Sequence, residues 1–390
     1  MTPAARLQAA IELLDAVVRA ARDGGAAADT VIAAYFKGRR YAGSQDRRAV
    51  RELVYAAIRH CGERPESGRA AMLALAAVRP DLRAQFGAGP YAPAPVSAEE
   101  RAAEPGLAPA WLAARLRHVE LSALLERAPL DLRANRLRCP REEVLAAFPG
   151  SHATPHAPFG VRLDEPLAIE QHALFRDGCI EVQDEGSQLV ARACAAAPGH
   201  LIVDLCAGAG GKTLALAADM GGTGRLLACD TDRARLARLA PRAARAGAAG
   251  IETRLLDPGR EAGQLADLAD AADVVLVDAP CSGTGTWRRN PEARWRLTPA
   301  RLDRLVALQR RLLALAATLV RPGGALVYAV CSLLDEEGAD QLAGFRAAQP
   351  DWHVKPPFSG VGTERGDGLL LTPGGDGTDG FFVARLERPC

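Results

Sequence analysis

The sequence predicts an α/β protein, with an open parallel sheet in its C-terminal half, a small α+β module before it and an all-helical N-terminal region. Apolar residues recur at helical spacing over residues 4–60, and after His200 apolar strands, Gly-rich turns and helices alternate. The expected parts are a helical region (1–80), a Pro/Ala-rich linker (81–109), the α+β module (110–198) and the sheet domain (199–390).

Each part has its own pattern of expected elements. In the helical region, Gly24-Gly25 and Gly43-Ser44 interrupt the periodic apolar residues, and a further short helix is expected at 67–78. The module is expected to contain helices at 110–126, 140–148 and 186–196, with a strand at Asp131–Arg136 and a strand and turn over Gly178–Glu185. The expected strands of the sheet are Leu201–Leu205, Arg225–Cys229, Ile251–Leu255, Val274–Val277 and Ala325–Ala329.

Composition excludes several classes of protein. The chain is 48% hydrophobic and has a net charge of +1, so it is not basic overall, although residues 1–60 hold ten Lys or Arg against six Asp or Glu. Its nine cysteines are scattered without a CxxC pair, which argues against a zinc site and a disulfide framework. No apolar run reaches the roughly 18 residues of a membrane span. We expect a reduced, cytoplasmic protein without a metal.

A glycine-rich turn follows the first strand of the sheet, between Asp204 and Thr213. A Walker phosphate loop would need glycine at Cys206, and a dinucleotide fingerprint would need it at Thr213, so both alternatives fail. Asp230 ends the next expected strand, where a carboxylate can accept hydrogen bonds from a ribose. An adenosine-bearing cofactor without a pyrophosphate fits, and S-adenosylmethionine is the common one; the alternative is a tight turn that binds no ligand.

Two cysteines stand where two other apolar strands end. One strand leads to Asp278 and Cys281, and the other leads to Cys331. Because parallel strands bring their carboxyl ends to one edge, both thiols should lie on the cofactor side. A thiolate that adds to carbon 6 of a pyrimidine makes carbon 5 nucleophilic toward a methyl group, and a second group is then useful for release. Asp278 could hydrogen-bond N3 and the exocyclic amine of the base.

These segments together resemble the RsmB/Sun-type (NOL/NOP/Sun) RNA cytosine-5 methyltransferases, whose cofactor is S-adenosylmethionine. The resemblance covers residues 110–388 and includes Val182–Gln188 before the sheet and Asp379–Phe382 near the end. The stretch Ser44–Val54 is similar to the NusB-like RNA-binding module of bacterial members. The resemblance implies a Rossmann-like, doubly wound class I methyltransferase sheet.

The resemblance also implies a role for each motif residue. Cys331 corresponds to the nucleophile, Cys281 to the residue that assists release, and Asp278 to a residue that contacts the base and the methionine end of the cofactor. Pro-Cys-Ser at Cys281 differs from the Pro-Cys-Gln of DNA cytosine methyltransferases. The residues implied for the cofactor are Cys206, Ala207, Gly208, Ala209, Gly210, Gly211, Lys212, Asp230 at the ribose, Asp257 near the adenine, and Asp278.

The sequence departs from the family pattern at three places. Val330 stands where the family usually has threonine, and Ala209 replaces the usual proline of the cofactor loop. The histidine that often precedes Asp-Gly-Phe-Phe is absent from Gly374–Thr378. We expect activity with altered positioning at the nucleophile and a looser cofactor loop.

The implied partner is RNA, because a target base leaves its stack most easily in single-stranded loops. Ribosomal RNA of the small subunit is the leading substrate and transfer RNA the next, with a monomeric enzyme and no membrane partner. Two other interpretations remain: a non-catalytic RNA-binding assembly factor that keeps the fold as a scaffold, and a methyltransferase acting on adenine or protein. Both leave the paired cysteines unexplained.

Overall fold

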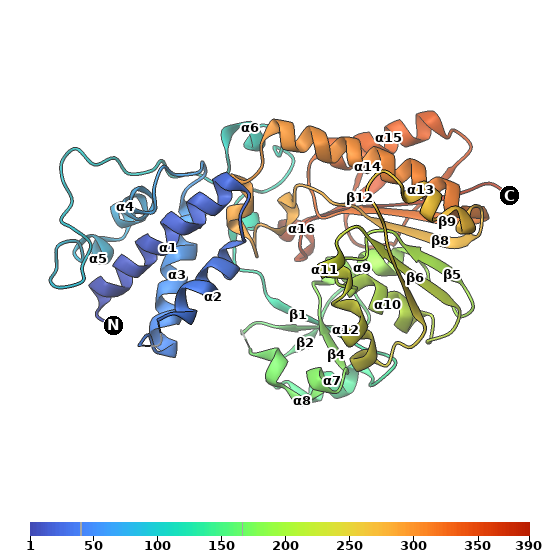
Figure 1. The fold of residues 1–390 in the computed structure, drawn as a ribbon, viewed down its shortest axis with the longest axis horizontal. Coiled ribbons are helices and arrows are strands. Elements are labelled where there is room, and N and C mark those ends of the chain that lie inside the picture. Colours follow the sequence, from blue (N-terminus) through green and yellow to red (C-terminus); the bar gives the residue numbers. More distant parts are fainter. Residues whose placement is uncertain (40, 166) are drawn as a thin grey trace. The chain divides into compact units, whose positions relative to one another are not determined.

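The computed structural model describes residues 1–39, 41–165 and 167–390, which divide into two compact units (Figure 1). The helical unit comprises Met1–Arg127 and Thr286–Pro299, and the sheet unit comprises Ala128–Gly285 and Ala300–Cys390. The helical unit therefore includes a segment from far along the chain. These units are coarser than the four parts expected from the sequence, whose boundaries stay predictions.

The core of the helical unit lies between its first four helices. The helix α1 begins after Thr2, whose hydroxyl accepts a hydrogen bond from the Ala5 N–H, and ends at Gly24 in the left-handed region. The helix α4 crosses α1 closely, since a Cβ on Gly68 would lie 2.3 Å from the Ile11 carbonyl oxygen. The helices of this unit are α1 (Pro3–Asp23), α2 (Ala28–Lys37), α3 (Ser44–His60), α4 (Gly68–Val78), α5 (Pro80–Arg83) and α6 (Ala110–Ala113).

The segment Thr286–Pro299 completes the helical unit. Arg294 is fully buried and donates hydrogen bonds to the carbonyls of Ile58 (2.6 Å) and Cys61 (2.9 Å), where α3 ends. The neighbouring Trp295 packs into the same apolar core, and the Glu292 carboxylate accepts from the Ala28 N–H at the start of α2 (2.9 Å). The helix termini thus find hydrogen-bond partners that no local cap provides.

The prediction of a continuous helix at 110–126 is wrong. The structure has only α6 there, followed by turns and a single 3-10 turn at Ala123–Leu125. Leu112 and Leu116 are buried as helical spacing predicts, but the chain turns directly after them and buries Leu124 from a separate turn. Tertiary packing has overridden the local helical pattern.

The sheet unit begins with a small antiparallel sheet in the order β2-β3-β1-β4. Arg162 on β3 makes a two-pronged ion pair with Asp131 on β1, with both N–O distances 2.7 Å. The expected strand and the expected helix near 140–148 are confirmed. The elements are β1 (Leu130–Ala134), α7 (Arg141–Ala147), β2 (His152–Ala153), β3 (Gly160–Leu163), α8 (Ala173–Arg176) and β4 (Ile180–Val182).

The larger sheet follows the order β11-β12-β13-β9-β8-β5-β6-β7, with β5 to β9 pairing in parallel. The chain enters at β5, moves outward to β7 and then returns to β8 beside β5. The carboxyl ends of β5 and β8 therefore flank the point where the strand order reverses, the usual ligand crevice of such sheets. The strands are β5 (Leu201–Asp204), β6 (Arg225–Asp230), β7 (Ile251–Leu255), β8 (Ala272–Asp278) and β9 (Val320–Val330).

These strands confirm the predicted Rossmann-like sheet, but the antiparallel strands that extend it past β9 were not predicted. They are β10 (His353–Lys355), β11 (Thr363–Arg365), β12 (Gly368–Leu371) and β13 (Phe381–Glu387). The helices of this part are α9 (Glu185–Ala193), α10 (Gly211–Asp219), α11 (Arg233–Leu236), α12 (Leu239–Ala246), α13 (Glu261–Gln264), α14 (Pro299–Leu319), α15 (Ala339–Ala348) and α16 (Pro373–Asp376). In the described parts of the chain, none of the helices has the length and apolarity to cross a membrane.

Candidate active site

The predicted cofactor loop joins β5 to α10, and its conformation requires glycine. Gly208 (φ +56°) and Gly210 (φ +86°) lie in the left-handed region, and a Cβ on Gly210 would sit 2.1 Å from a methyl carbon of Leu239. A Cβ on Gly211 would meet no atom within 4 Å, so there is open space beside the first turn of α10. The loop therefore packs tightly against Leu239 at Gly210 and is open at Gly211, where a ligand could approach the backbone.

Asp204 anchors this loop from inside the sheet. Its carboxylate is buried and accepts a hydrogen bond from the Thr213 hydroxyl at 2.7 Å. Burial raises the pKa of Asp204 to about 7, against the weaker opposing effect of the Thr213 hydrogen bond. The side chain thus links the end of β5 to the first turn of α10.

The two acids predicted for the adenosine end lie in different settings. Asp230 ends β6 and accepts hydrogen bonds from the N–H groups of Gly208 and Asp232, both at 2.7 Å. These bonds hold its carboxylate against the cofactor loop. Asp257 is exposed and accepts from the Gln264 side chain at 3.2 Å. Asp230 is therefore held in place by the backbone, whereas Asp257 lies on the surface.

Lys212 and Asp278 join the cofactor loop to the end of β8. The Lys212 ammonium lies 2.7 Å from the Asp278 carboxylate and 5.4 Å from the centre of the Phe381 ring. Burial lowers the pKa of Lys212, but the charge and hydrogen bond of Asp278 outweigh it, so the pKa is raised overall. Lys212 therefore stays protonated and paired with Asp278 at the carboxyl edge of the sheet.

The two predicted cysteines lie together. The sulfurs of Cys281, after β8, and Cys331, after β9, are 3.3 Å apart. The hydrogen bond with Cys331 and burial raise the pKa of Cys281 well above its ordinary value. Cys281 is therefore protonated at neutral pH, and its S–H group can donate a hydrogen bond to the Cys331 sulfur.

Beside the thiols is a polar cluster that sequence reasoning missed. Glu337 is fully buried, and its carboxylate accepts hydrogen bonds from the Ser282 N–H (2.9 Å), the Gln309 amide (2.9 Å) and the hydroxyls of Ser282 and Ser332 (2.6 Å for Ser332). In the sequence Glu337 lies in an acidic run, typical of solvent-exposed residues. The available signal was that a serine follows each of the two cysteines.

The departures from the family pattern have local settings in the structure. Val330 is buried at the end of β9 and pairs with Phe382 on β13. The Ala209 carbonyl accepts a hydrogen bond from the Arg242 side chain at 2.6 Å, which restrains the loop where proline is absent. The expectation of a looser loop stays a prediction.

Four of the remaining thiols are buried, as expected of cysteines that pack in a core. Burial raises the pKa of Cys61, Cys139 and Cys229 to about 11, 12 and 12, and also that of Cys194, whereas Cys390 is exposed. In the parts of the chain that the structure describes, no cluster of three or more His, Cys, Asp or Glu could hold a metal ion.

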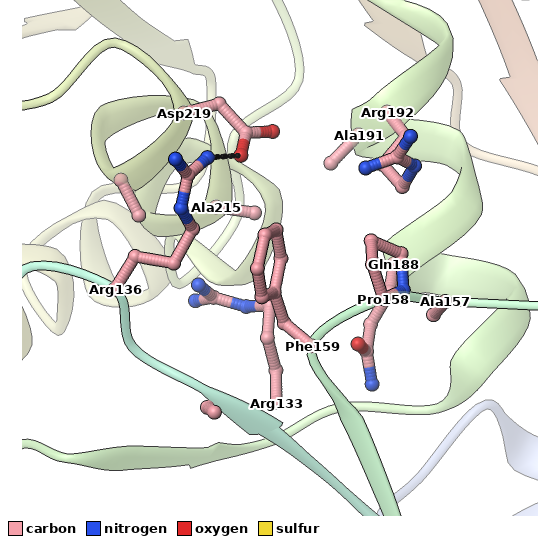
Figure 2. A pocket seen from close by; sticks show the side chains of 12 residues that line it. Arg133, Arg136, Ala157, Pro158, Phe159, Gln188, Ala191, Arg192, Ala215 and Asp219 are labelled. Carbon is pink, nitrogen blue, oxygen red and sulfur yellow. Dashed lines mark hydrogen bonds and ion pairs between the residues drawn. The ribbon is translucent and has the colours of Figure 1, made fainter. Parts of the chain in front are cut away.

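A separate pocket lies at the other end of α10 (Figure 2). It is lined by residues of β1, the segment before β3, α9 and α10, and the Arg136 guanidinium lies over the Phe159 ring, 4.8 Å from its centre. Arg136 pairs with Asp219 at 3.3 Å, and burial raises the pKa of Asp219. None of its lining residues belongs to the predicted site, which lies at the carboxyl edge of the sheet.

Comparison with known proteins places this arrangement in a family. A family model described as 16S rRNA methyltransferase RsmB/F matches residues 191–387, which include both cysteines and the cofactor loop. The chain belongs to this family. Membership confirms the resemblance seen in the sequence, and it makes the chain a member of an RNA methyltransferase family.

Individual relatives agree with this assignment. The chain is 37% identical over 272 residues to a probable ribosomal RNA small subunit methyltransferase B of Synechocystis sp., covering 66% of this chain and 60% of that one. It is 34% identical over 294 residues to ribosomal RNA small subunit methyltransferase B of Pasteurella multocida, covering 72% and 65%. The chain thus spans less than two thirds of the length of these relatives.

Solved structures support the fold. The crystal structure of PH0851 is 24% identical, has a TM-score of 0.79, and matches over 100% of this chain and 99% of that one. A methyltransferase homolog from Pyrococcus horikoshii is 25% identical, with a TM-score of 0.62, and covers 71% and 94%. The Rossmann-like methyltransferase fold with its helical extension is therefore a known architecture.

Proposed function

We propose that the protein is an S-adenosylmethionine-dependent RNA cytosine-5 methyltransferase that acts on small-subunit ribosomal RNA. The observation that carries the proposal is the pair of sulfurs, Cys281 and Cys331, 3.3 Å apart at the edge that also holds the cofactor loop. Membership of the RsmB/F family supports the choice of RNA and of the ribosomal small subunit.

The residues of the loop fit the cofactor. Cys206, Ala207, Gly208, Ala209, Gly210, Gly211 and Lys212 would hold it, with Asp230 at the ribose, Asp257 near the adenine and Asp278 at the methionine end. When bound, S-adenosylmethionine supplies an electrophilic methyl group. The open space beside Gly211 and the fixed carboxylate of Asp230 support this assignment.

The protein's own residues would do the rest of the chemistry. Cys331 adds to C6 of a flipped-out cytosine, which makes C5 nucleophilic. The Asp278 carboxylate, which is paired with Lys212, accepts a hydrogen bond from the exocyclic amine of the base and so orients the ring for addition. After methyl transfer the C5 proton passes to solvent water, the C6–S bond breaks and Cys331 leaves as a thiolate. The Cys281 thiol, whose sulfur lies 3.3 Å away, assists this release by donating a hydrogen bond to the departing sulfur.

The proposal also covers the setting of the reaction. We propose that the enzyme works as a monomer in the cytoplasm and that the NusB-like helical unit contributes to RNA binding. A transfer RNA cytosine is the second candidate substrate. A non-catalytic assembly factor is disfavoured because it would have no use for two adjacent thiols beside Lys212 and Asp278.

The test is bisulfite sequencing of ribosomal and transfer RNA from cells that lack the gene, complemented with wild type or with Cys331→Ala. We expect one cytosine of small-subunit rRNA to be protected only by the wild type. Loss of the nucleophile should lower transfer by at least about 1,000-fold. If the cytosine that loses protection lies in tRNA, the substrate is tRNA, the second candidate. Protection restored by Cys331→Ala would contradict the mechanism.

A further inference from the structure

Among the residues that the structure describes, no cation pairs with the buried carboxylate of Glu337. The side chain is fully buried. Its charge is instead stabilised by hydrogen bonds from Ser282, Ser332 and Gln309. Burying a carboxylate costs free energy unless hydrogen bonds or an opposite charge compensate for the lost water. Here hydrogen bonds alone do so.

The donors come from the two segments that carry the thiols. Ser282 directly follows Cys281 and gives both its N–H and its hydroxyl, while Ser332 directly follows Cys331 and gives its hydroxyl at 2.6 Å. The two hydroxyl oxygens are themselves 3.1 Å apart. One carboxylate therefore binds both Cys-Ser segments at once.

Glu337 is itself fixed in place. The Tyr328 hydroxyl donates to the Glu337 carbonyl at 2.6 Å, and the Gln309 amide that binds its carboxylate also donates to the Pro280 carbonyl at 2.8 Å. A Cβ on the next residue, Gly338, would lie 2.8 Å from the buried Phe382 ring, so this turn packs closely against β13. The carboxylate can therefore act as a rigid link between the segments.

We propose that Glu337 is a positioning residue whose buried carboxylate ties the Cys281 segment to the Cys331 segment and so sets the distance between the two sulfurs. Glu337 touches neither sulfur and acts through Ser282 and Ser332. The importance of that distance rests on the proposed function, because the two thiols would have to serve adjacent carbons of one base. A displacement of about 1 Å at such a site can cost roughly 100-fold in rate.

The test measures the separation of the sulfurs without RNA or cofactor. Diamide oxidises the two thiols to a disulfide, while its N=N bond takes up their two protons and two electrons to become a hydrazine. The rate of disulfide formation is followed by mass spectrometry of the linked Cys281 and Cys331 peptides. It reports how often the two sulfurs come within bonding distance. The variants are Glu337→Ala, which removes the link, and Glu337→Gln, which keeps its shape and one acceptor oxygen. Asp340→Asn, an exposed acid in α15, is the matched control.

We expect disulfide formation to slow by roughly tenfold or more in Glu337→Ala, less in Glu337→Gln, and not at all in Asp340→Asn. The fully buried Cys194 should stay protected from alkylation in all four proteins, as a check that they are folded. If Glu337→Ala does not fold, the Glu337→Gln rate decides. An unchanged rate in a folded Glu337 variant overturns the proposal.

A second readout separates this inference from the proposed function. In methyl-transfer assays, Glu337→Gln should lower kcat and leave the Kd of a cofactor analogue unchanged, because its hydrogen bonds reach only the Cys-Ser segments and Gln309. Wild-type protein that forms the disulfide readily but transfers no methyl group would contradict the proposed function and leave the link intact. Slower disulfide formation with kcat unchanged would overturn the role in positioning.

Discussion

The sheet unit and the helical unit are organised in different ways. In the sheet unit the predicted site residues Asp204, Asp278 and Cys331 lie at the end of a strand that the sequence reveals or directly after it, so strand order brings them together. The helical unit is completed by Thr286–Pro299, which joins it from 160 or so residues away in sequence. Local pattern thus predicts which residues meet at the edge of the sheet, but it does not define the helical folding unit.

The first prediction tests whether Thr286–Pro299 stabilises the helical unit and leaves the sheet unit unaffected. Arg294→Met removes the donors to the Ile58 and Cys61 carbonyls and leaves them buried without partners, which should destabilise this unit by about 2–4 kcal/mol. Three of the four tryptophans (Trp111, Trp287 and Trp295) lie in the helical unit, so urea unfolding followed by fluorescence reports mainly on it.

Two comparisons sharpen this result. Arg22→Met removes an arginine whose side chain is 59% exposed, so it should change stability by no more than about 0.5 kcal/mol. Binding of a cofactor analogue to Arg294→Met should match wild type under native conditions, since every proposed cofactor residue belongs to the sheet unit. A variant as stable as wild type would show that the segment does not hold the helical unit together.

The second prediction concerns the pH response of the sheet unit. The folded pKa of Asp204, about 7, is above its ordinary value of 3.8, so the folded state binds an extra proton between about pH 4 and 7. Stability from this residue is therefore present at low pH and is lost as pH rises through that window. Asp204→Asn should stabilise the protein by about 2 kcal/mol more at pH 8 than at pH 5.

The measurement is urea unfolding followed by circular dichroism at both pH values, with the exposed Asp257→Asn as the control in the same unit. The control should show no difference between the two conditions relative to wild type. Equal effects of Asp204→Asn at pH 5 and pH 8 would mean that this carboxyl is not held neutral by its burial.

The features that could be predicted from the sequence are those that depend on local pattern, and the features that were missed depend on packing between distant segments. The parallel strands and the two Cys-Ser segments are encoded locally, because a buried strand is an apolar run and its end carries the functional residue. Glu337 could not be predicted, since its burial depends on Gln309 and Tyr328 from other elements. The helix expected at 110–126 failed for the same reason: packing of Leu116 and Leu124 decided the backbone there, and the periodicity did not.

The central claim is that the two adjacent thiols act in sequence on one cytosine. The most direct measurement incubates Cys281→Ala with small-subunit rRNA and S-adenosylmethionine and maps the protein by mass spectrometry after denaturation. The account predicts a stable protein–RNA adduct on the peptide that contains Cys331, absent when Cys331 is also replaced by alanine. Full turnover by Cys281→Ala, or an adduct on another residue, would contradict it.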